Sequence, residues 1–274
     1  MTPRLRSVLF MPANNARAVE KARTLDCDAV VLDLEDAVGP EDKEAARAAA
    51  AAALSAGFTG KIAAVRINGL DTPWGEADLR SLAGADAVVL PKVGDASVVA
   101  EASGQAAGAP VWAMIETCRG VLNVANIAAA PGVGALVLGQ NDLAAEMRCR
   151  PGADRAPLWS AMGATVTAAR AHGLTALDGV YNAFQDTAGF EAECRQGRAF
   201  GFDGKTLIHP SQIAAANAAW TPDPDEVAWA RAVVAAYAAP GAEAAGVLRV
   251  DGRMVERLHL AEARRILELT GPAA

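Results

Sequence analysis

The sequence predicts an α/β protein that forms a closed (β/α)₈ barrel, a TIM barrel, with a helical extension or lid at its C-terminus. Eight short apolar segments rich in Val, Ile and Leu recur along the 274 residues. Most of them are continuously apolar, which is typical of strands covered on both faces. Alanine-rich segments of helical character separate them. Eight such units in a chain of this length favour a closed parallel barrel over an open doubly wound sheet.

The eight predicted strands lie at 6–12, 28–36, 61–68, 85–92, 110–117, 134–142, 174–181 and 204–210. The segment 174–181 also fits a loop, and 204–210 is short. Between the strands the residue order predicts helices. Asn14 and Asn15 are candidate caps for the helix that follows them, and Pro40 with its acidic neighbours suits the first turn of an alanine-rich outer helix.

The chain continues beyond the eighth unit with a predicted helix at 223–239, a Gly/Ala-rich stretch at 240–246 and a final segment at 247–274. The Gly/Ala-rich composition is typical of a flexible hinge. We therefore expect the barrel to span 1–239. We expect 247–274 to form a lid or to pack on a neighbouring subunit.

The composition excludes several classes of function. The net charge is -7 and the pI is about 5.1, which argues against a general affinity for nucleic acid or anionic membranes. A local basic patch around one anionic ligand is still compatible with this net charge. The four cysteines form no CxxC pair, and there is no signal-peptide core or apolar membrane span. We expect a cytoplasmic protein. Dinucleotide, P-loop and nucleophile-elbow motifs are absent from the sequence.

Charged and polar residues gather where the predicted strands end. In a parallel barrel these carboxyl ends form one rim, where active sites are built. The residues at this rim are Glu35, Asp36, Arg66, Asn68, Lys92, Glu116, Arg119, Asn141, Asp142, Asp178 and His209. Carboxylates that converge in a partly desolvated site repel one another unless a cation lies between them. Glu116 and Asp142, from neighbouring strands, are placed to hold one divalent ion, and their oxygen ligands favour Mg²⁺, with Mn²⁺ as the alternative.

Ordinary ion pairs at the strand ends are the alternative interpretation. Arg66 with Glu116, and Lys92 with Glu35 or Asp36, are the plausible pairs, since charges on loops are common. Any one of these acids alone fits that interpretation, whereas four of them after consecutive strands favour a metal-assisted site. Before Pro210, the side chain of His209 suits either a turn-stabilising or a substrate-facing role.

Seven motifs, in order along nearly the whole chain, resemble the citrate lyase beta-subunit-like proteins. They are LFMPANNARAVEKA, VVLDLEDAVGPEDKEAAR, VRING, VVLPKV, AMIETCRG, LGQNDLAAE and DGKTLIHPSQI. These proteins are relatives of malyl-CoA and citramalyl-CoA lyases in the phosphoenolpyruvate/pyruvate aldolase superfamily. The resemblance implies a Mg²⁺-dependent barrel, a homotrimer or hexamer, that makes or breaks a carbon-carbon bond. The substrate would be a 3-hydroxyacyl-CoA thioester, cleaved to a 2-oxo acid and an acyl-CoA.

The resemblance also implies roles for individual residues. Arg66 would bind substrate and stabilise an enolate. Glu116 and Asp142 would be the protein ligands of the metal and would contact substrate through it. Glu35 and Asp36 would orient water around the ion.

Further from the metal pair, the resemblance places Lys21 against the CoA moiety and Pro210 among the substrate-binding residues. Some relatives carry an arginine six residues before that lysine, where this chain has Asn15, with Arg17 nearby. Near the C-terminus relatives often have the sequence GKMID with a proline two residues on, whereas this chain has GRMVERL. Glu256 therefore takes the place of a catalytic aspartate that serves as acid or base, and Leu258 takes the place of the proline.

Alternative functions keep the same scaffold. A thioesterase or malate-synthase-like enzyme would act on the same acyl-CoA, and an aldolase for free hydroxy-oxo acids would need no CoA. A citrate lyase beta subunit would work only in a multi-subunit complex with an acyl carrier, and a binding scaffold would have no activity. The products formed from malyl-CoA and the presence of stoichiometric partners distinguish these hypotheses.

Overall fold

The computed structural model describes residues 4–239, 241–242 and 246–270, and the chain in it divides into two compact units. One unit is the barrel, residues 5–219, and the other is a C-terminal unit that begins at Trp220. The expected boundary after residue 239 therefore differs from the division in the structure. The reason is that the helix before this boundary packs on the helix after it.

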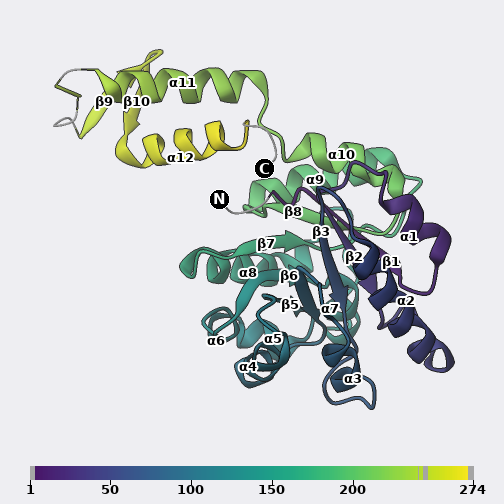
Figure 1. The fold of residues 1–274 in the computed structure, drawn as a ribbon. Helices are drawn as coiled ribbons and strands as arrows, with labels where there is room; N and C mark the ends of the chain where they lie inside the picture. The colour runs from purple at the N-terminus through teal and green to yellow at the C-terminus, as the bar shows by residue number, and fades with distance from the viewer. Residues whose placement is uncertain (1–3, 240, 243–245, 271–274) are drawn as a thin grey trace. The chain divides into compact units, whose positions relative to one another are not determined.

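Eight parallel strands close into a barrel in the order of the chain, which confirms the predicted fold class (Figure 1). They are β1 Ser7–Pro12, β2 Ala29–Asp33, β3 Ile62–Arg66, β4 Ala87–Leu90, β5 Val111–Ile115, β6 Val133–Leu138, β7 Thr175–Asp178 and β8 Gly204–Leu207. Each lies within a predicted segment, or in the case of β6 starts one residue before it. Closure depends on a close approach of β8 to β1, because a side chain at Gly204 would overlap the main-chain oxygen of Leu5.

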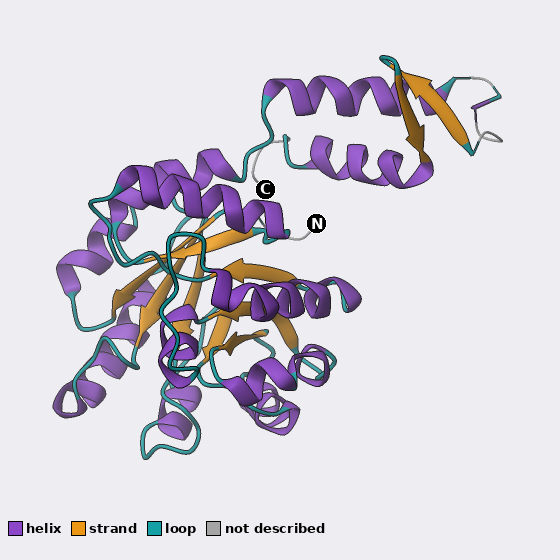
Figure 2. Ribbon diagram, turned by 180° about the vertical axis from the view of Figure 1, so that it is seen from behind, coloured by secondary structure: helices purple, strands orange, loops and turns teal. Residues whose placement is uncertain are grey.

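Helices surround the strands of the barrel unit (Figure 2). They are α1 Ala16–Ala22, α2 Lys43–Ala56, α3 Gly75–Arg80, α4 Ala96–Gln105, α5 Cys118–Leu122, α6 Val124–Ala128, α7 Gln140–Glu146, α8 Trp159–Ala171, α9 Thr187–Phe200 and α10 Ile213–Ala219. Three short 3₁₀ helices in the described part of this unit are η1 Pro40–Asp42, η2 Ala156–Leu158 and η3 Pro210–Gln212. Asn15 caps α1 as predicted, since its side chain accepts a hydrogen bond from the Ala18 N–H at 3.1 Å.

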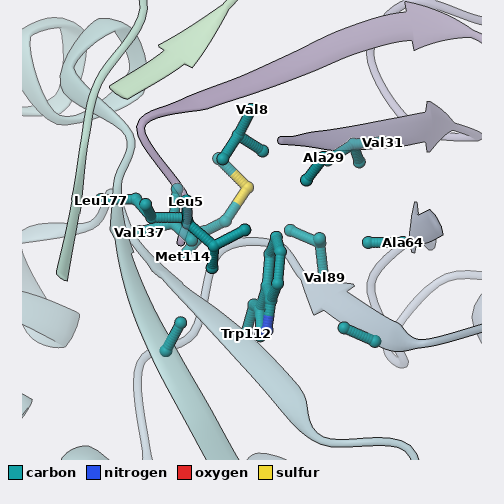
Figure 3. Packing of buried hydrophobic residues seen from close by; sticks show 12 residues of the cluster. Leu5, Val8, Ala29, Val31, Ala64, Val89, Trp112, Met114, Val137 and Leu177 are labelled. Atoms are coloured by element: carbon teal, nitrogen blue, oxygen red, sulfur yellow. The ribbon is translucent and has the colours of Figure 1, made fainter. Parts of the chain in front are cut away.

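The barrel interior is filled by alternate residues of the strands (Figure 3). They are Val8, Ala29, Val31, Ala64, Ala87, Val89, Trp112, Met114, Ala135, Val137 and Leu177, and Leu5, just before β1, packs with them. Fully burying a side chain such as valine or leucine stabilises the fold by about 1.5–3 kcal/mol. Because side chains alternate between the two faces of a strand, the next inward positions at the carboxyl ends are those of Asp33, Arg66 and Glu116.

The C-terminal unit consists of two helices and a two-stranded antiparallel sheet. Helix α11 spans Pro224–Ala238, strands β9 and β10 span Val247–Val250 and Arg253–Glu256, and helix α12 spans Arg257–Glu268. Asp251 and Gly252 both have positive φ, 48° and 79°, as a two-residue type I′ hairpin requires. The predicted helical extension is present as α12, whereas the hairpin was not predicted.

Helix α11 packs on α12 through a common apolar core. Ala230, Val233 and Tyr237 contribute from α11, and Ala263 and Ile266 from α12. The Tyr237 hydroxyl also donates a hydrogen bond of 3.1 Å to a main-chain oxygen of β10. These contacts place α11 in the C-terminal unit. Among all the helices that the structure describes, none combines the length and apolarity that a membrane crossing requires.

Candidate active site

A cavity of about 390 Å³ lies where the strands of the barrel end. Residues at or just after the carboxyl ends of β1, β2, β3, β5, β6, β7 and β8 all contribute to its wall. The polar members of the lining are Asp33, Asp36, Arg66, Glu116, Gln140, Asn141, Asp142, Asn182 and Thr206. The cavity therefore brings together Asp36, Arg66, Glu116, Asn141 and Asp142 from the set expected at the rim.

Arg66 is a buried cation fixed by the neighbouring strand. Its Nε and Nη2 lie 2.7 and 2.5 Å from the two carboxylate oxygens of Asp33, the residue opposite it in the β2–β3 register. Its Nη1 lies 2.9 Å from Glu35 Oε2. Burial by itself lowers the pKa of Arg66, but the hydrogen bonds and charge of Asp33 and the charge of Glu35 raise it above the ordinary value. Arg66 is therefore a permanent cation in the cavity wall.

Lys92 connects three of the acids at the strand ends. Its backbone takes the left-handed conformation, with φ of 51°, which is uncommon for a residue with a side chain. In this conformation the Lys92 N–H donates a hydrogen bond of 2.7 Å to Glu116 Oε1, while its ammonium group pairs with Glu35 and lies 3.5 Å from Asp36 Oδ1. The predicted pairing of Lys92 with Glu35 or Asp36 is confirmed. The predicted direct pairing of Arg66 with Glu116 is wrong, because Arg66 pairs with Asp33 and Glu35.

Glu116 is the least compensated acid in the cavity. It is 1% exposed, and its Oε2 accepts no hydrogen bond from any residue that the structure describes. Burial raises the pKa of Glu116 to about 7, and the negative charges of Asp142 and Glu35 add to this effect. The Lys92 N–H and the charge of Arg66 oppose it. A buried carboxylate oxygen without a partner costs free energy unless a cation is close to it.

Gly139 makes room for this carboxylate. A side chain at Gly139 would overlap Glu116 Oε2 and Cβ, so only glycine allows the start of α7 to pass so closely. The same helix carries Asp142 in its first turn, and Asp142 lines the same cavity as Glu116. Two carboxylates from adjacent strand ends suit a hard divalent cation such as Mg²⁺. Since no group of three or more His, Cys, Asp or Glu side chains in the described ranges is arranged to hold a metal, other ligands would be water or substrate.

Several residues expected at the rim have other positions. Arg119 is 73% exposed and lies 3.4 Å from Asp95, outside the cavity. Asp178 is fully buried and does not line the cavity; it lies 2.7 Å from Arg155 Nη1 and 2.9 Å from Lys205 Nζ. These two residues were expected among the charges of the site, but ion pairs hold both of them away from it.

The side chain of His209 makes contacts that stabilise the turn after β8. Its Nδ1 accepts a hydrogen bond of 3.2 Å from the Ser211 N–H, and its ring stacks on Phe184 with centroids 4.6 Å apart. The adjacent Pro210 opens η3, and neither residue lines the cavity. Asn141 does line the cavity and exchanges two side-chain hydrogen bonds, of 2.9 and 3.2 Å, with Asn182.

Two other predicted site residues of the barrel unit do not line the cavity, and a third belongs to the other unit. Lys21 is exposed on α1. Glu256 belongs to the C-terminal unit, where it precedes α12 and its N–H donates to His259 Nδ1 at 2.9 Å. Asn68 is buried beside β3 and accepts a hydrogen bond of 2.6 Å from Lys43 Nζ. The roles expected for Lys21, Pro210 and Glu256 therefore remain predictions.

The sequence model of the HpcH/HpaI aldolase/citrate lyase family matches residues 6–210, which include all eight strands of the barrel and every residue of the cavity. The chain belongs to this family. The predicted resemblance to citrate lyase beta-subunit-like enzymes is thereby confirmed. A (3S)-malyl-CoA thioesterase of Cereibacter sphaeroides is 47% identical over 265 residues, 96% of this chain and 93% of the relative. An L-malyl-CoA/beta-methylmalyl-CoA lyase of the same species is 36% identical over 296 residues, with 96% and 93% coverage.

Solved structures of the family share the fold. CitE from Mycobacterium tuberculosis, in complex with magnesium, acetoacetate and coenzyme A, superposes with a TM-score of 0.83 at 33% identity. The superposition covers 99% of this chain and all of that chain. A citrate lyase beta subunit of the same organism, complexed with oxaloacetate and magnesium, gives a TM-score of 0.71 at 35% identity, with 80% and 98% coverage.

Proposed function

We propose that this chain is a Mg²⁺-dependent enzyme that cleaves a 3-hydroxyacyl-CoA thioester of the malyl-CoA type. The observation that carries the proposal is the unpartnered, buried Glu116 Oε2, which shares one cavity with Asp142 and the cation Arg66. Magnesium in the complexes of two related proteins, with coenzyme A or oxaloacetate, supports this assignment. Mn²⁺ has the same ligand preference and is the expected substitute.

Glu116 and Asp142 would hold the ion. When bound, a divalent cation binds and polarises the carboxylate and hydroxyl oxygens of the substrate. Glu116 must be ionised for this role, and its pKa of about 7 means that it is largely ionised at slightly alkaline pH even before metal arrives. Glu35 and Asp36, at the end of β2, are proposed to orient water beside the ion.

Arg66 would stabilise negative charge on the thioester oxygen. A guanidinium has five N–H donors, and Asp33 takes the bonds from Nε and Nη2 described above, so further donors remain for a ligand. Asp33 and Glu35 fix the plane of the group before substrate arrives, which lowers the cost of reorganisation during the reaction. The same donors suit the oxyanion of thioester hydrolysis and the enolate of carbon-carbon cleavage.

Hydrolysis is the net reaction that sequence similarity favours. The thioesterase relative is 47% identical, whereas the lyase relative is 36% identical. In this reaction water adds to the thioester carbonyl carbon, the carbon-sulfur bond breaks, and the sulfur leaves with a proton as free CoA thiol. Purified protein with Mg²⁺ and malyl-CoA should then release malate and CoA in equal amounts, and EDTA should stop the reaction. Absence of any metal-dependent loss of malyl-CoA would refute the proposal.

Carbon-carbon cleavage is the second candidate, which the identity of over 30% to malyl-CoA lyase and to a citrate lyase beta subunit favours. In this reaction the hydroxyl proton is removed, the bond between the carbinol carbon and the α-carbon breaks, and the resulting thioester enolate takes up a proton. Glu256 is proposed as the acid that supplies it. Glyoxylate and acetyl-CoA would then form instead of malate and free CoA. Mass spectrometry of one reaction mixture separates the two candidates.

The remaining predictions concern assembly and substrate contacts. We propose a homotrimer or hexamer in which the C-terminal segment closes over an active site, with Lys21 contacting the CoA moiety and Pro210 the substrate. Glu256→Gln should impair turnover far more than metal binding. Equal loss of both would contradict a catalytic role for Glu256. Activity of the purified chain alone would exclude a subunit that functions only in a complex.

A further inference from the structure

A buried lysine lies behind the charged wall of the cavity. Lys43, the first residue of α2, is 6% exposed, and its ammonium group donates three hydrogen bonds. Two go to the main-chain oxygens of Leu34 and Glu35, each at 2.8 Å, and the third goes to Asn68 Oδ1 at 2.6 Å. All three acceptors are neutral. Lys43 does not line the cavity.

The surroundings of Lys43 hold the ammonium group in one place. Asn68 Nδ2 donates to the Leu34 oxygen at 2.9 Å and to Asp78 Oδ2 at 2.6 Å. Arg47 Nε in turn donates to Asp78 Oδ1 at 2.7 Å. The ammonium nitrogen also lies 5.4 Å from the centre of the Trp74 ring. A buried cation is tolerated where hydrogen bonds and nearby negative charge replace water, and such a network has little freedom to rearrange.

Glu35 is the residue that this network holds by its main chain. Its N–H donates to Asp33 Oδ1 at 2.9 Å, and its main-chain oxygen accepts from Lys43 Nζ and from the Val38 N–H. Its carboxylate then lies between Arg66 and Lys92 and pairs with both. Lys92 in turn donates its N–H to Glu116. A continuous set of contacts therefore connects Lys43 with the proposed metal ligand.

We propose that Lys43 is a positioning residue that acts through Glu35: it fixes the turn after β2 so that the Glu35 carboxylate bridges Arg66 and Lys92. This inference rests on the proposed function for its kinetic test. Without Lys43, the Leu34 and Glu35 oxygens lose a common donor, and the Glu35 carboxylate no longer has a single position. Arg66 would keep Asp33 but lose its second carboxylate partner.

The test is a double-mutant cycle with Lys43→Met and Glu35→Gln, measured as kcat and KM on malyl-CoA with saturating Mg²⁺. We expect Lys43→Met to lower kcat by about 10- to 100-fold, the usual effect of residues that orient a metal site, with KM nearly unchanged. We expect the double variant to be no slower than Glu35→Gln alone, because Lys43 acts through that residue. Losses that multiply in the double variant, or an unchanged kcat in Lys43→Met, would overturn the proposal. Lys61→Met, at the amino end of β3, is the matched lysine control.

Hydrogen exchange provides a readout that does not depend on activity. Lys43→Met should speed exchange of the amides at 34–38 in the folded protein, whereas Lys61→Met should not. Unchanged exchange at 34–38 would contradict a positioning role for Lys43 even if the protein turned over no substrate. The exchange measurement therefore tests this inference separately from the proposed function. If Lys43→Met does not fold, Asn68→Ser removes the side-chain contacts to Lys43 and Leu34 and is tested by the same cycle and the same exchange measurement.

Discussion

Replacement of Glu116 by glutamine isolates the cost of its buried charge. Glu116→Gln keeps the shape of the side chain and an oxygen that can accept the hydrogen bond from the Lys92 N–H. It removes the negative charge and replaces the unpartnered Oε2 by an amide nitrogen. The variant therefore separates two effects of one residue: the stability of the metal-free barrel and the capacity to bind the ion.

The magnitude follows from the pKa. In the folded protein the pKa of Glu116 is about 7, against an ordinary value of 4.5. An acid with a raised pKa binds its proton more tightly when folded, so it does not penalise folding below pH 4.5. The penalty grows as pH rises through 7 and reaches about 3 kcal/mol above it. The amide of the variant costs about 1–3 kcal/mol as an unsatisfied buried group, but at every pH alike. The free energy of unfolding of Glu116→Gln, relative to that of the parent, should therefore increase by about 2 to 3 kcal/mol from pH 5 to pH 8.

The assay is urea unfolding of metal-free protein at pH 5 and pH 8, with the free energy of unfolding compared between parent and variant at each pH. Glu76→Gln is the matched control, because the Glu76 carboxylate is 59% exposed on α3 and pairs only with Arg80 among the described residues. The difference in the free energy of unfolding between Glu76→Gln and the parent should change little with pH. Added Mg²⁺ at 100 times its Kd should stabilise the parent by about 2.7 kcal/mol and leave Glu116→Gln unaffected.

Two results would refute this reasoning. One is a difference in the free energy of unfolding between parent and Glu116→Gln that stays constant from pH 5 to pH 8, because the carboxyl would then not be desolvated. The other is equal stabilisation of both proteins by Mg²⁺, because the ion would then bind elsewhere.

Three further predictions test the site and the barrel. Gly139→Ala should abolish Mg²⁺ binding by calorimetry, since the new methyl group overlaps Glu116; an unchanged Kd would contradict this. The affinity for Mg²⁺ should fall about tenfold per pH unit below pH 7, as Glu116 takes up a proton, and level off above pH 7; a flat profile from pH 5 to 8 would argue against this ligand. Gly204→Ala should destabilise the barrel by about 3 kcal/mol or more in thermal unfolding, because its methyl group overlaps the Leu5 main-chain oxygen. Gly104→Ala on α4, where the new methyl group meets open space, should not destabilise it. An equal effect of the two substitutions would be inconsistent with closure at β8.

The barrel could be predicted because its strands carry their signal locally. Each strand is a short apolar segment covered on both faces, and the helices between them leave few alternatives to a closed parallel sheet. The C-terminal hairpin also had a local signal, Asp251-Gly252 between two short alternating segments. It was overlooked because residues 247–274 were interpreted as one lid. The division at Trp220 had no such signal, since it depends on how α11 packs on α12.

The site could be predicted in part. The carboxyl ends of the strands identified Arg66 and Glu116, because a charged residue at or just after the end of a strand lies at the mouth of the barrel. The polar segment after β6 identified Asp142, which lies in the first turn of α7, and all three residues line the cavity. Asp33 was missed, although the inward alternation Ala29, Val31, Asp33 along β2 would have found it.

Lys43 and Gly139 could not be found in this way. Their roles depend on contacts between segments distant in sequence: the former with the turns after β2 and β3, the latter with the end of β5. For the same reason the sequence placed Arg119 and Asp178 at the site, since their ion pairs with Asp95 and Lys205 form only in the folded chain.

A crystal grown with Mn²⁺ tests the central claim most directly, since the anomalous signal locates this ion without assumptions about its ligands. We expect one peak in the cavity, about 2.0–2.2 Å from a carboxylate oxygen of Glu116 and from one of Asp142, and no peak in Glu116→Gln. A peak that touches neither residue, or an empty cavity at saturating Mn²⁺, would contradict it.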